Sequence, residues 1–567
     1  MNLKFVSSIG SYTVMNPRSI YLVTIPLVLS AFTHLWNPLG FPSFWYVEEI
    51  YLQRAMYVLH GLGNVDPLTT YGHPYDHPYF GQLLLAGFFK IINYPDLLNP
   101  SASMPSLDSS SNSNGDFLYS INVLHLIPRL LIGSLAVLDT FLIYKIAEHS
   151  YHNKTVAFMA SIIFAVMPAT WLMRKILLEN LLLPFLLSSI LFAVYYRKSS
   201  RSKTYPNKAS ANQSILVLIS GIFMAIAIFI KIPALTMIPL VGFLLFNRAD
   251  KNLIHIVLWL IPVILIPIIW PFNAILDGEL DLWLRDLLWQ TQRQGDSLLS
   301  SLTTIFEIDP VLIVVGIAGL VYAEMKRDYM ILLWAVPFLI FLFLMGFVSF
   351  FYLIPLIPLF SIAGARLIED LVSRINNKRN RRIMTSTIIL SIVIFGIISS
   401  TLLITTNVNS SYLEVYAFVA QHIVQESQKA IHENKQVNEK NAARPSGYND
   451  GIITLIGNIW TRGYYWIPKY VFDTDVDIIL LPSSVSSPPA IHTEKILLKL
   501  DNHVLRSQRY NEKDSEHLKW LNTLNSTTNK IAEFSEKSSI FKDYNSYPYS
   551  GSMNHNRGIA ATELRAN

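Results

Sequence analysis

The sequence predicts a polytopic α-helical membrane protein with about eleven transmembrane helices and a small extracytoplasmic α/β domain at its C-terminal end. Of its 567 residues, 52% are hydrophobic and only 15% are charged, whereas about a quarter of the residues of a soluble protein are charged. Apolar runs that could cross a hydrocarbon core of about 30 Å recur through the first 400 residues. Beyond residue 406 the sequence becomes polar, with charges of both signs.

Hydropathy places the spanning segments, and the basic loops orient them. The segments are expected at residues 20–36, 119–147, 155–170, 176–196, 213–230, 232–246, 253–270, 310–323, 329–348, 352–368 and 383–405. Lys and Arg crowd alternate connections, above all residues 197–208 and 374–382. Because cytoplasmic loops attract Lys and Arg, the N-terminus is expected inside and the C-terminus outside the cell membrane. The first apolar run lacks a cleavage site and indicates a retained anchor.

Composition also narrows the class of function. The net charge of +5 is typical of basic cytoplasmic loops and does not argue for a nucleic-acid partner. The chain has no cysteine, which excludes disulfides, thiol catalysis and cysteine-ligated metals.

Three regions are expected along the chain. Residues 1–406 form the transmembrane domain, whose first outer loop is 37–118. Residues 407–540 combine a helical stretch near 412–432 with β-like runs at 451–456 and 476–481, which predicts a modest outer α/β domain. Residues 541–567 are polar and rich in Asn and Ser, a composition typical of disorder.

An acidic pair follows the first span. Glu48 and Glu49 lie within about a dozen residues of the membrane exit and are flanked by aromatic residues. Adjacent residues point in different directions, so one of them is expected to act as a general base for an acceptor hydroxyl while the other supports it. The alternative is a solvated pair of loop carboxylates.

A rigid aromatic turn, residues 71–79, comes next. Two prolines, a glycine and three tyrosines favour a turn over a helix. His73, Asp76 and His77 could ligate a divalent metal together with a glutamate, although their spacing matches no strong metal signature. The favoured interpretation is a pocket wall shaped by hydrogen bonds.

Cations lie at the outer ends of several spans, against the positive-inside bias. Arg174 falls in a short outer loop, Lys231 ends one span, and Arg129 lies inside the second span. A lipid phosphate in the outer leaflet would account for them, and snorkelling to the headgroups is the alternative. For Arg129 a buried pair with Asp139 is a further alternative, although ten residues of helix separate the two.

The ordered motifs resemble the GT-C superfamily of membrane glycosyltransferases, in the branch of the protein O-mannosyltransferases and the lipid A aminoarabinose transferase. The resemblance covers roughly residues 20–370. It rests on Glu48-Glu49-Ile-Tyr51-Leu-Gln-Arg-Ala55, Asp76-His77-Pro78-Tyr79, Pro128-Arg129-Leu-Leu-Ile-Gly133, Arg174-Lys-Ile-Leu-Leu-Glu179-Asn180, residues 221–231 and Phe351-Tyr352-Leu-Ile-Pro355-Leu-Ile-Pro358. Two departures stand out: Glu48 replaces the usual Asp, and Phe351 replaces an Arg.

This resemblance implies transfer of a sugar, mannose or a similar hexose, from a polyprenyl-phosphate carrier of the dolichyl or undecaprenyl type. The acceptor would be a protein or a lipid or glycan outside the cytoplasm, with inversion at the sugar carbon and no required cofactor. The implied catalytic carboxylates are Glu48 as base, Glu49 as its partner and Glu179 as a second acidic candidate. The implied substrate-binding side chains are Tyr51, His77, Arg129, Arg174, Lys231 and Tyr352.

Two other classes of function stay open from sequence. A transporter or flippase of lipid-linked sugars could use the same outer cations, but it would favour internal repeats, and none is evident. A non-catalytic membrane scaffold would explain residues 407–567 but would leave the carboxylates and the outer cations without a role.

Overall fold

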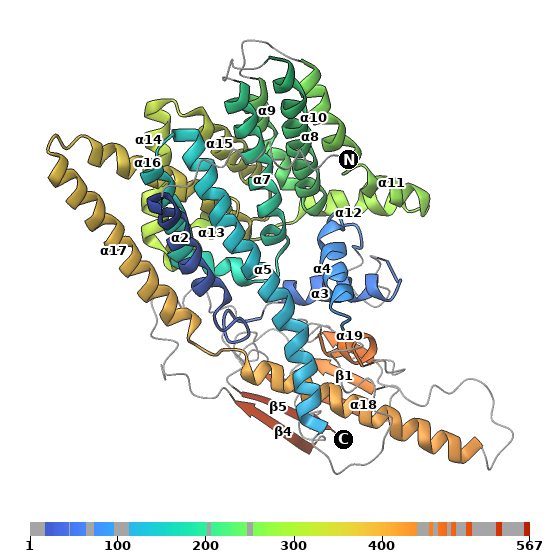
Figure 1. Cartoon of the computed structure of the whole chain (residues 1–567). Coiled ribbons are helices and arrows are strands. Elements are labelled where there is room, and N and C mark those ends of the chain that lie inside the picture. The colour runs from blue at the N-terminus through green and yellow to red at the C-terminus, as the bar shows by residue number, and fades with distance from the viewer. Residues whose placement is uncertain are drawn as a thin grey trace.

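The computed structural model shows a bundle of apolar helices with a mixed helix and sheet region below it (Figure 1). It describes residues 17–44, 46–63, 73–95, 113–200, 206–246, 253–438, 453–457, 463–472, 478–482, 495–501, 529–535 and 561–566. The predicted polytopic helical class is confirmed in that most described residues are helical and apolar.

The bundle is built from long helices, several of them broken by short 3₁₀ turns. They are α2 (Pro17–Leu35), α5 (Ser113–Tyr151), α6 (Lys154–Val166), η2 (Pro168–Arg174), α7 (Leu178–Ser200), α8 (Pro206–Ile230), η3 (Ile232–Met237), α9 (Ile238–Phe246), α10 (Leu253–Leu265), α14 (Pro310–Lys326), α15 (Tyr329–Leu344), η4 (Phe350–Leu353), α16 (Leu356–Ser373) and α17 (Lys378–Ile404). Shorter helices connect them: α3 (Tyr46–Leu59), α4 (Phe80–Ile91), α11 (Ile269–Leu276), α12 (Leu280–Gln292) and α13 (Leu298–Ile308).

Five of the described helices are long and apolar enough to span a membrane, and a sixth span results if α6 and η2, bent by 68°, form one. The protein is therefore a multi-pass membrane protein, while the count of eleven stays a prediction. The difference has a physical origin, because several expected spans are helices of 16 or 17 residues, such as α14 and α15, and a straight span needs about 20.

Small residues let the helices of the bundle approach closely. A Cβ added at Gly319 on α14 would lie 2.5 Å from the backbone carbon of Ala363 on α16. Glycine is therefore the residue that this crossing requires, as in many packed transmembrane helices.

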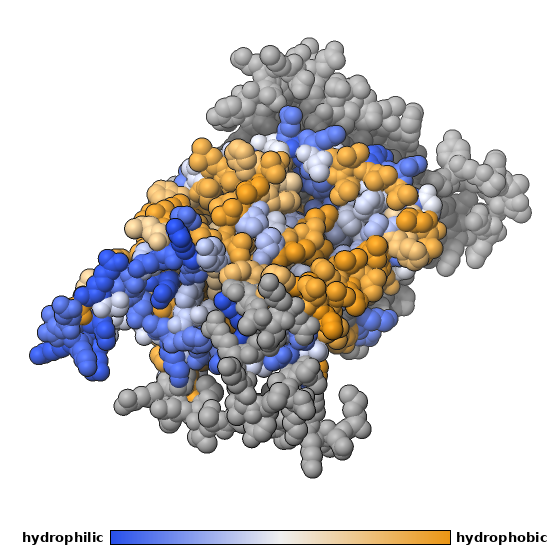
Figure 2. Space-filling view, turned by 90° about the horizontal axis from the view of Figure 1, so that it is seen from above, coloured by the Kyte–Doolittle hydropathy of each residue, from blue (hydrophilic) through white to orange (hydrophobic). Residues whose placement is uncertain are grey.

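The periphery of the bundle is hydrophobic. Hydrophobic residues cover a large share of the surface seen from above (Figure 2). In the segment Leu253–Leu276, which comprises α10 and α11, and in α17 only 28% of the most apolar window is buried inside the protein. These faces have the character of surfaces that contact lipid tails.

The C-terminal region forms a five-stranded sheet next to two helices. Its elements are β1 (Ile453–Gly457), β2 (Ile478–Pro482), β3 (Lys495–Asp501), β4 (Asn529–Ser535), β5 (Ala561–Ala566), α18 (Ser410–Asn438) and α19 (Gly463–Tyr470). The strand order is β2-β1-β3-β5-β4, parallel between β1 and both β2 and β3 and antiparallel between β5 and both β3 and β4. The tail expected to be disordered, residues 541–567, contains strand β5. Backbone pairing with β3 and β4 orders these residues. The other residues of that tail lie outside the described residues.

Aromatic contacts join this region to the first outer helix and to α5. Tyr470 of α19 meets Tyr57 of α3 at 4.7 Å between ring centroids, and Phe472 meets Phe117 of α5 at 4.6 Å. Helix α18 crosses the N-terminal part of α5 and contacts it (Figure 1). The C-terminal region therefore covers the end of the bundle where α3 lies.

Candidate functional site

The acidic pair lies in the first turn of α3, and both side chains are fully buried. The two carboxylates point in different directions, as helical geometry predicts for adjacent residues. Glu48 meets Arg129 of α5, whereas Glu49 meets His125 one turn earlier on the same helix. Buried carboxylates are costly unless they are paired and hydrogen-bonded, and this region supplies both kinds of contact.

Glu48 is held by two cations and a backbone amide. Arg129 Nη2 donates to Oε1 at 3.0 Å and to Oε2 at 3.1 Å, Lys175 Nζ lies 3.6 Å from Oε2, and the Ile176 amide donates to Oε1 at 2.9 Å. Burial by itself would raise the pKa of Glu48, but Arg129, Lys175 and the amide together hold it below its usual value. Arg129 thus pairs with Glu48, and the alternative pairing with Asp139 is wrong.

Glu49 and His125 are joined by a buried hydrogen bond. His125 Nε2 lies 2.8 Å from Glu49 Oε1, and His125 Nδ1 lies 2.9 Å from the Ile121 carbonyl. Glu49 Oε2 is buried and has no hydrogen-bond partner among the described residues.

Arg174 caps the end of α2. Its guanidinium donates to the carbonyls of Thr33 at 2.8 Å, Trp36 and Asn37 at 3.0 Å, and only 1% of the residue is exposed. Thr33 lies in the last turn of α2, and Trp36 and Asn37 directly follow the helix, where carbonyls lack intrahelical partners and a cation is favourable. The phosphate contact expected for Arg174 stays a prediction.

The turn that follows Arg174 is tied down locally. Asn180 donates through its side-chain amide to the carbonyls of Leu172 at 2.8 Å and Lys175 at 2.7 Å. These bonds fix the passage from η2 to α7, so that the Ile176 amide and Lys175 both reach Glu48.

The described part of the aromatic turn, residues 73–79, packs against α12, and its polar side chains bind different partners. His73 Nδ1 lies 2.7 Å from Asp286 of α12, and Asp76 forms an ion pair with Arg54 of α3 at 2.6 Å. Burial would raise the pKa of Asp76, but Arg54 holds it below its usual value. Within the described ranges no three His, Asp or Glu side chains converge on one point, so the alternative metal set of His73, Asp76 and His77 is not assembled.

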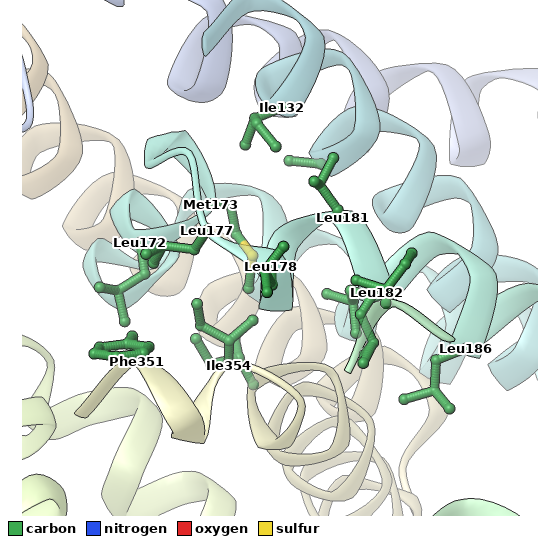
Figure 3. Packing of buried hydrophobic residues seen from close by; sticks show 14 of the residues in the cluster. Ile132, Leu172, Met173, Leu177, Leu178, Leu181, Leu182, Leu186, Phe351 and Ile354 are labelled. Atoms are coloured by element: carbon green, nitrogen blue, oxygen red, sulfur yellow. The ribbon is translucent and has the colours of Figure 1, made fainter. Parts of the chain in front are cut away.

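A second charged pair lies at a small cleft inside the bundle. Lys231, between α8 and η3, donates to Glu179 at the start of α7, and its ammonium lies 4.2 Å from the centre of the Tyr352 ring. Glu179 Oε2 is buried without a hydrogen-bond partner among the described residues. The rest of the cleft is lined by apolar and proline residues, namely Leu182, Leu186, Pro233, Ala234, Met237, Phe338, Leu342 and Pro355. Leu182 and Leu186 belong to the same packed cluster as Phe351 and Ile354 (Figure 3).

Tyr51 and His77, two more of the predicted residues, lie near the pair of Glu179 and Lys231. Tyr51 of α3 is buried, and burial together with the charge of Glu179 raises the pKa of its phenol. Burial and the charge of Lys231 lower the pKa of His77 to about 3, although Asp76 acts in the opposite sense. Glu48, Glu49, His125, Arg129 and Lys175 form a buried acidic cluster. Because Tyr51 stands one helical turn after Glu48, α3 connects this cluster to the cleft.

Sequence reasoning missed His125 and Arg54 and gave Lys175 no role of its own. His125 stands four residues before Arg129, on the same face of one helix, and this spacing beside a predicted acid pair is the signal that could have found it. No comparable signal marks Arg54, whose partner Asp76 lies 22 residues away across a turn.

The fold is similar to that of known membrane glycosyltransferases. A family model described as dolichyl-phosphate-mannose-protein mannosyltransferase matches residues 125–273 of the chain. This match and the fold confirm the resemblance predicted from the motifs. No curated protein matches the chain in sequence.

Solved structures share the fold at low sequence identity. ArnT from Cupriavidus metallidurans bound to undecaprenyl phosphate is 11% identical with a TM-score of 0.53, and the match covers 98% of each chain. The Archaeoglobus fulgidus oligosaccharyltransferase tethered to an acceptor peptide is 13% identical with a TM-score of 0.51, covering 86% of this chain and 69% of that one. At these identities the likeness concerns the fold alone.

Proposed function

We propose that the protein is a glycosyltransferase that moves a sugar from a polyprenyl-phosphate carrier to an acceptor on the extracytoplasmic side of the membrane. The observation that carries this proposal is the pair of Lys231 and Glu179 at an apolar cleft within the bundle. A cation beside an apolar cleft suits a phosphate attached to an isoprenoid chain. The family model and the undecaprenyl phosphate bound by ArnT from Cupriavidus metallidurans support this carrier class.

The proposed reaction is a direct displacement. Glu179 takes the proton of the acceptor hydroxyl, whose oxygen forms a bond to the anomeric carbon of the sugar. The bond from that carbon to the phosphate oxygen breaks, and its electron pair leaves with the lipid phosphate, which Lys231 stabilises. A single displacement inverts the anomeric centre. The sugar is mannose or a similar hexose, and the acceptor is a protein or a glycolipid.

Glu48, expected from sequence to be the base, takes a positioning role in this proposal. Both of its oxygens already accept from Arg129, and its lowered pKa makes it a weak base. Glu179 in contrast lines the cleft and has an oxygen without a described partner. Glu48 would instead hold Arg129 and Lys175 in place beneath the cleft, with Glu49 and His125 beside it.

The test measures transfer of radiolabelled mannose from polyprenyl-phosphate mannose to a mixed pool of membrane proteins and lipids. The full chain in liposomes is compared with Glu179→Gln, Lys231→Gln and Glu48→Gln, with and without chelator. Asp370→Asn is the control, since its pair with Arg374 is exposed on α16. Glu179→Gln and Lys231→Gln are expected to lose about 100-fold or more of the rate.

The outcomes separate the assignments. Glu48→Gln should keep its rate per folded molecule, and a folded Glu48→Gln without transfer would return the role of base to Glu48. Transfer lost only with chelator would establish a divalent metal. A carrier that crosses the membrane without any sugar transfer would replace the enzyme by a flippase.

A further inference from the structure

A second, larger cleft is lined by residues of α5, α7 and α9 and of the connection between α14 and α15. In Figure 1 α9, α14 and α15 lie at the end of the bundle away from α18. Its volume is about 460 Å³, within the range of small-molecule sites in proteins. Four chain segments line it: residues 149–152 at the end of α5, 194–198 on α7, 243–244 on α9, and 327–330 between α14 and α15. We call it the basal cleft.

The basal cleft lies far along the bundle from the proposed transfer site. Glu179 at the start of α7 belongs to the transfer site, and Arg197 on the same helix lines the basal cleft. The 18 residues that separate them correspond to roughly 27 Å of helix, close to the thickness of the hydrocarbon core. The basal cleft is therefore separate from the proposed transfer site.

Its lining is cationic. Arg197, Lys198 and Arg327 outnumber the one acidic residue, Asp328, among the lining residues. The guanidinium of Arg197 lies 5.2 Å from the centre of the Phe243 ring, which holds it at the wall. Lys198 Nζ lies 3.3 Å from His149 Nδ1. This excess of positive charge suits an anion.

The backbone at the cleft adopts an uncommon conformation twice. His152 and Arg327 have φ values of 52° and 51°, in the left-handed region. Histidine is among the residues that occupy this region more often, whereas arginine rarely does. Arg327 caps the end of α14, where glycine is the usual residue, so the conformation places a cation where glycine would be more favourable.

An exposed apolar surface continues from the cleft along the bundle. Tyr329 lines the cleft and is 53% exposed, and Val336, Ile340 and Phe343 on the same helix α15 are exposed as well. A molecule with a charged head and apolar tails matches this continuous surface.

We infer that the basal cleft binds the phosphate headgroup of an anionic membrane phospholipid, whose acyl chains lie along α15. Basic pockets between transmembrane helices are suited to such headgroups. Because the basal cleft lies roughly 27 Å of helix away from the proposed transfer site, the lipid would be a structural or regulatory partner and not the sugar donor.

The test places the full chain in vesicles of phosphatidylcholine with 20% phosphatidylglycerol, extracts it in mild detergent, and counts retained lipids by native mass spectrometry. The variant is Lys198→Gln combined with Arg327→Gln. Lys326→Gln is the matched control, because Lys326 is adjacent in sequence, lies near the ring of Tyr322 and does not line the cleft. Competition with inorganic phosphate and with soluble glycerol phosphate distinguishes a lipid from a free anion.

Wild type and Lys326→Gln are expected to retain phosphatidylglycerol in preference to phosphatidylcholine. The double variant should bind it about 25-fold more weakly, a factor of about five for each of the two cations removed. Its transfer rate in phosphatidylcholine vesicles should match that of wild type, which shows that it folds. Equal retention by the double variant overturns the inference, and so does millimolar inorganic phosphate that displaces all bound phosphatidylglycerol.

Discussion

Replacing Glu48 by Gln tests whether the buried acidic cluster anchors the fold. The substitution keeps the size of the side chain and the acceptor for the Ile176 amide, but it removes the negative charge that faces Arg129 at 3.0 Å and Lys175 at 3.6 Å. Both members of the Glu48–Arg129 pair are fully buried, so the guanidinium would be left uncompensated away from water.

The expected magnitude is large for a single substitution. Breaking a buried pair by removing one partner costs about 3–5 kcal/mol, whereas the exposed Asp370–Arg374 pair on α16 contributes at most about 0.5 kcal/mol after solvent screening. Combining Glu48→Gln with Arg129→Met should recover part of the loss, because the lone charge then disappears. Lys175 keeps its hydrogen bond to the Ser43 carbonyl at 2.6 Å and limits the recovery.

The assay is unfolding of the full chain in mixed micelles, with Asp370→Asn as the control. The free energy of unfolding of Glu48→Gln should fall by about 3–5 kcal/mol. The double variant should lose less of it, and the value for Asp370→Asn should match that of wild type. A loss below about 1 kcal/mol for Glu48→Gln would refute the reasoning, because it would mean that the pair is not desolvated. Non-additivity of the two single variants measures their coupling directly.

Three further predictions concern packing, capping and pH. Gly319→Ala should destabilise the protein by about 1–3 kcal/mol because its Cβ would meet the Ala363 backbone, while Gly242→Ala, with nothing within 4 Å, should not; thermal unfolding of both checks this. Arg174→Gln should cost about 1–3 kcal/mol through unsatisfied carbonyls of α2, and loss of transfer by a stable Arg174→Gln would instead support its phosphate role. The folded pKa of His77, about 3, lies below the unfolded value of 6.5, so its neutral form stabilises fully above pH 6.5 and stability declines as pH falls from 6.5 toward 3. His77→Gln should flatten that decline, and an unchanged pH profile of unfolding would contradict it.

Much of the helical architecture could be predicted from the sequence because hydropathy and helical periodicity are local properties. The short helix over residues 80–91, the amphipathic α12, and the helix and first two strands of the C-terminal region lie close to where composition indicates them. The opposite directions of Glu48 and Glu49 also follow from helix geometry alone.

The partners of the charged residues could not be predicted in this way. Arg129 meets Glu48 across 81 positions, and Arg174 reaches the end of α2 across more than 130. A cation at the outer end of a span looks the same in sequence whether it binds a phosphate or caps a helix. Only the neighbouring chain decides which of these it does.

The sequence by itself therefore determined the membrane-spanning character of the helices and the kinds of charged residue at one end of them. Only the tertiary structure decided that Glu48 forms buried ion pairs, that Arg174 binds backbone carbonyls, and that Glu179 and Lys231 meet at a cleft. The physical reason is that a buried charge must find a partner or a set of hydrogen bonds. Which partner it finds depends on how helices distant in sequence pack.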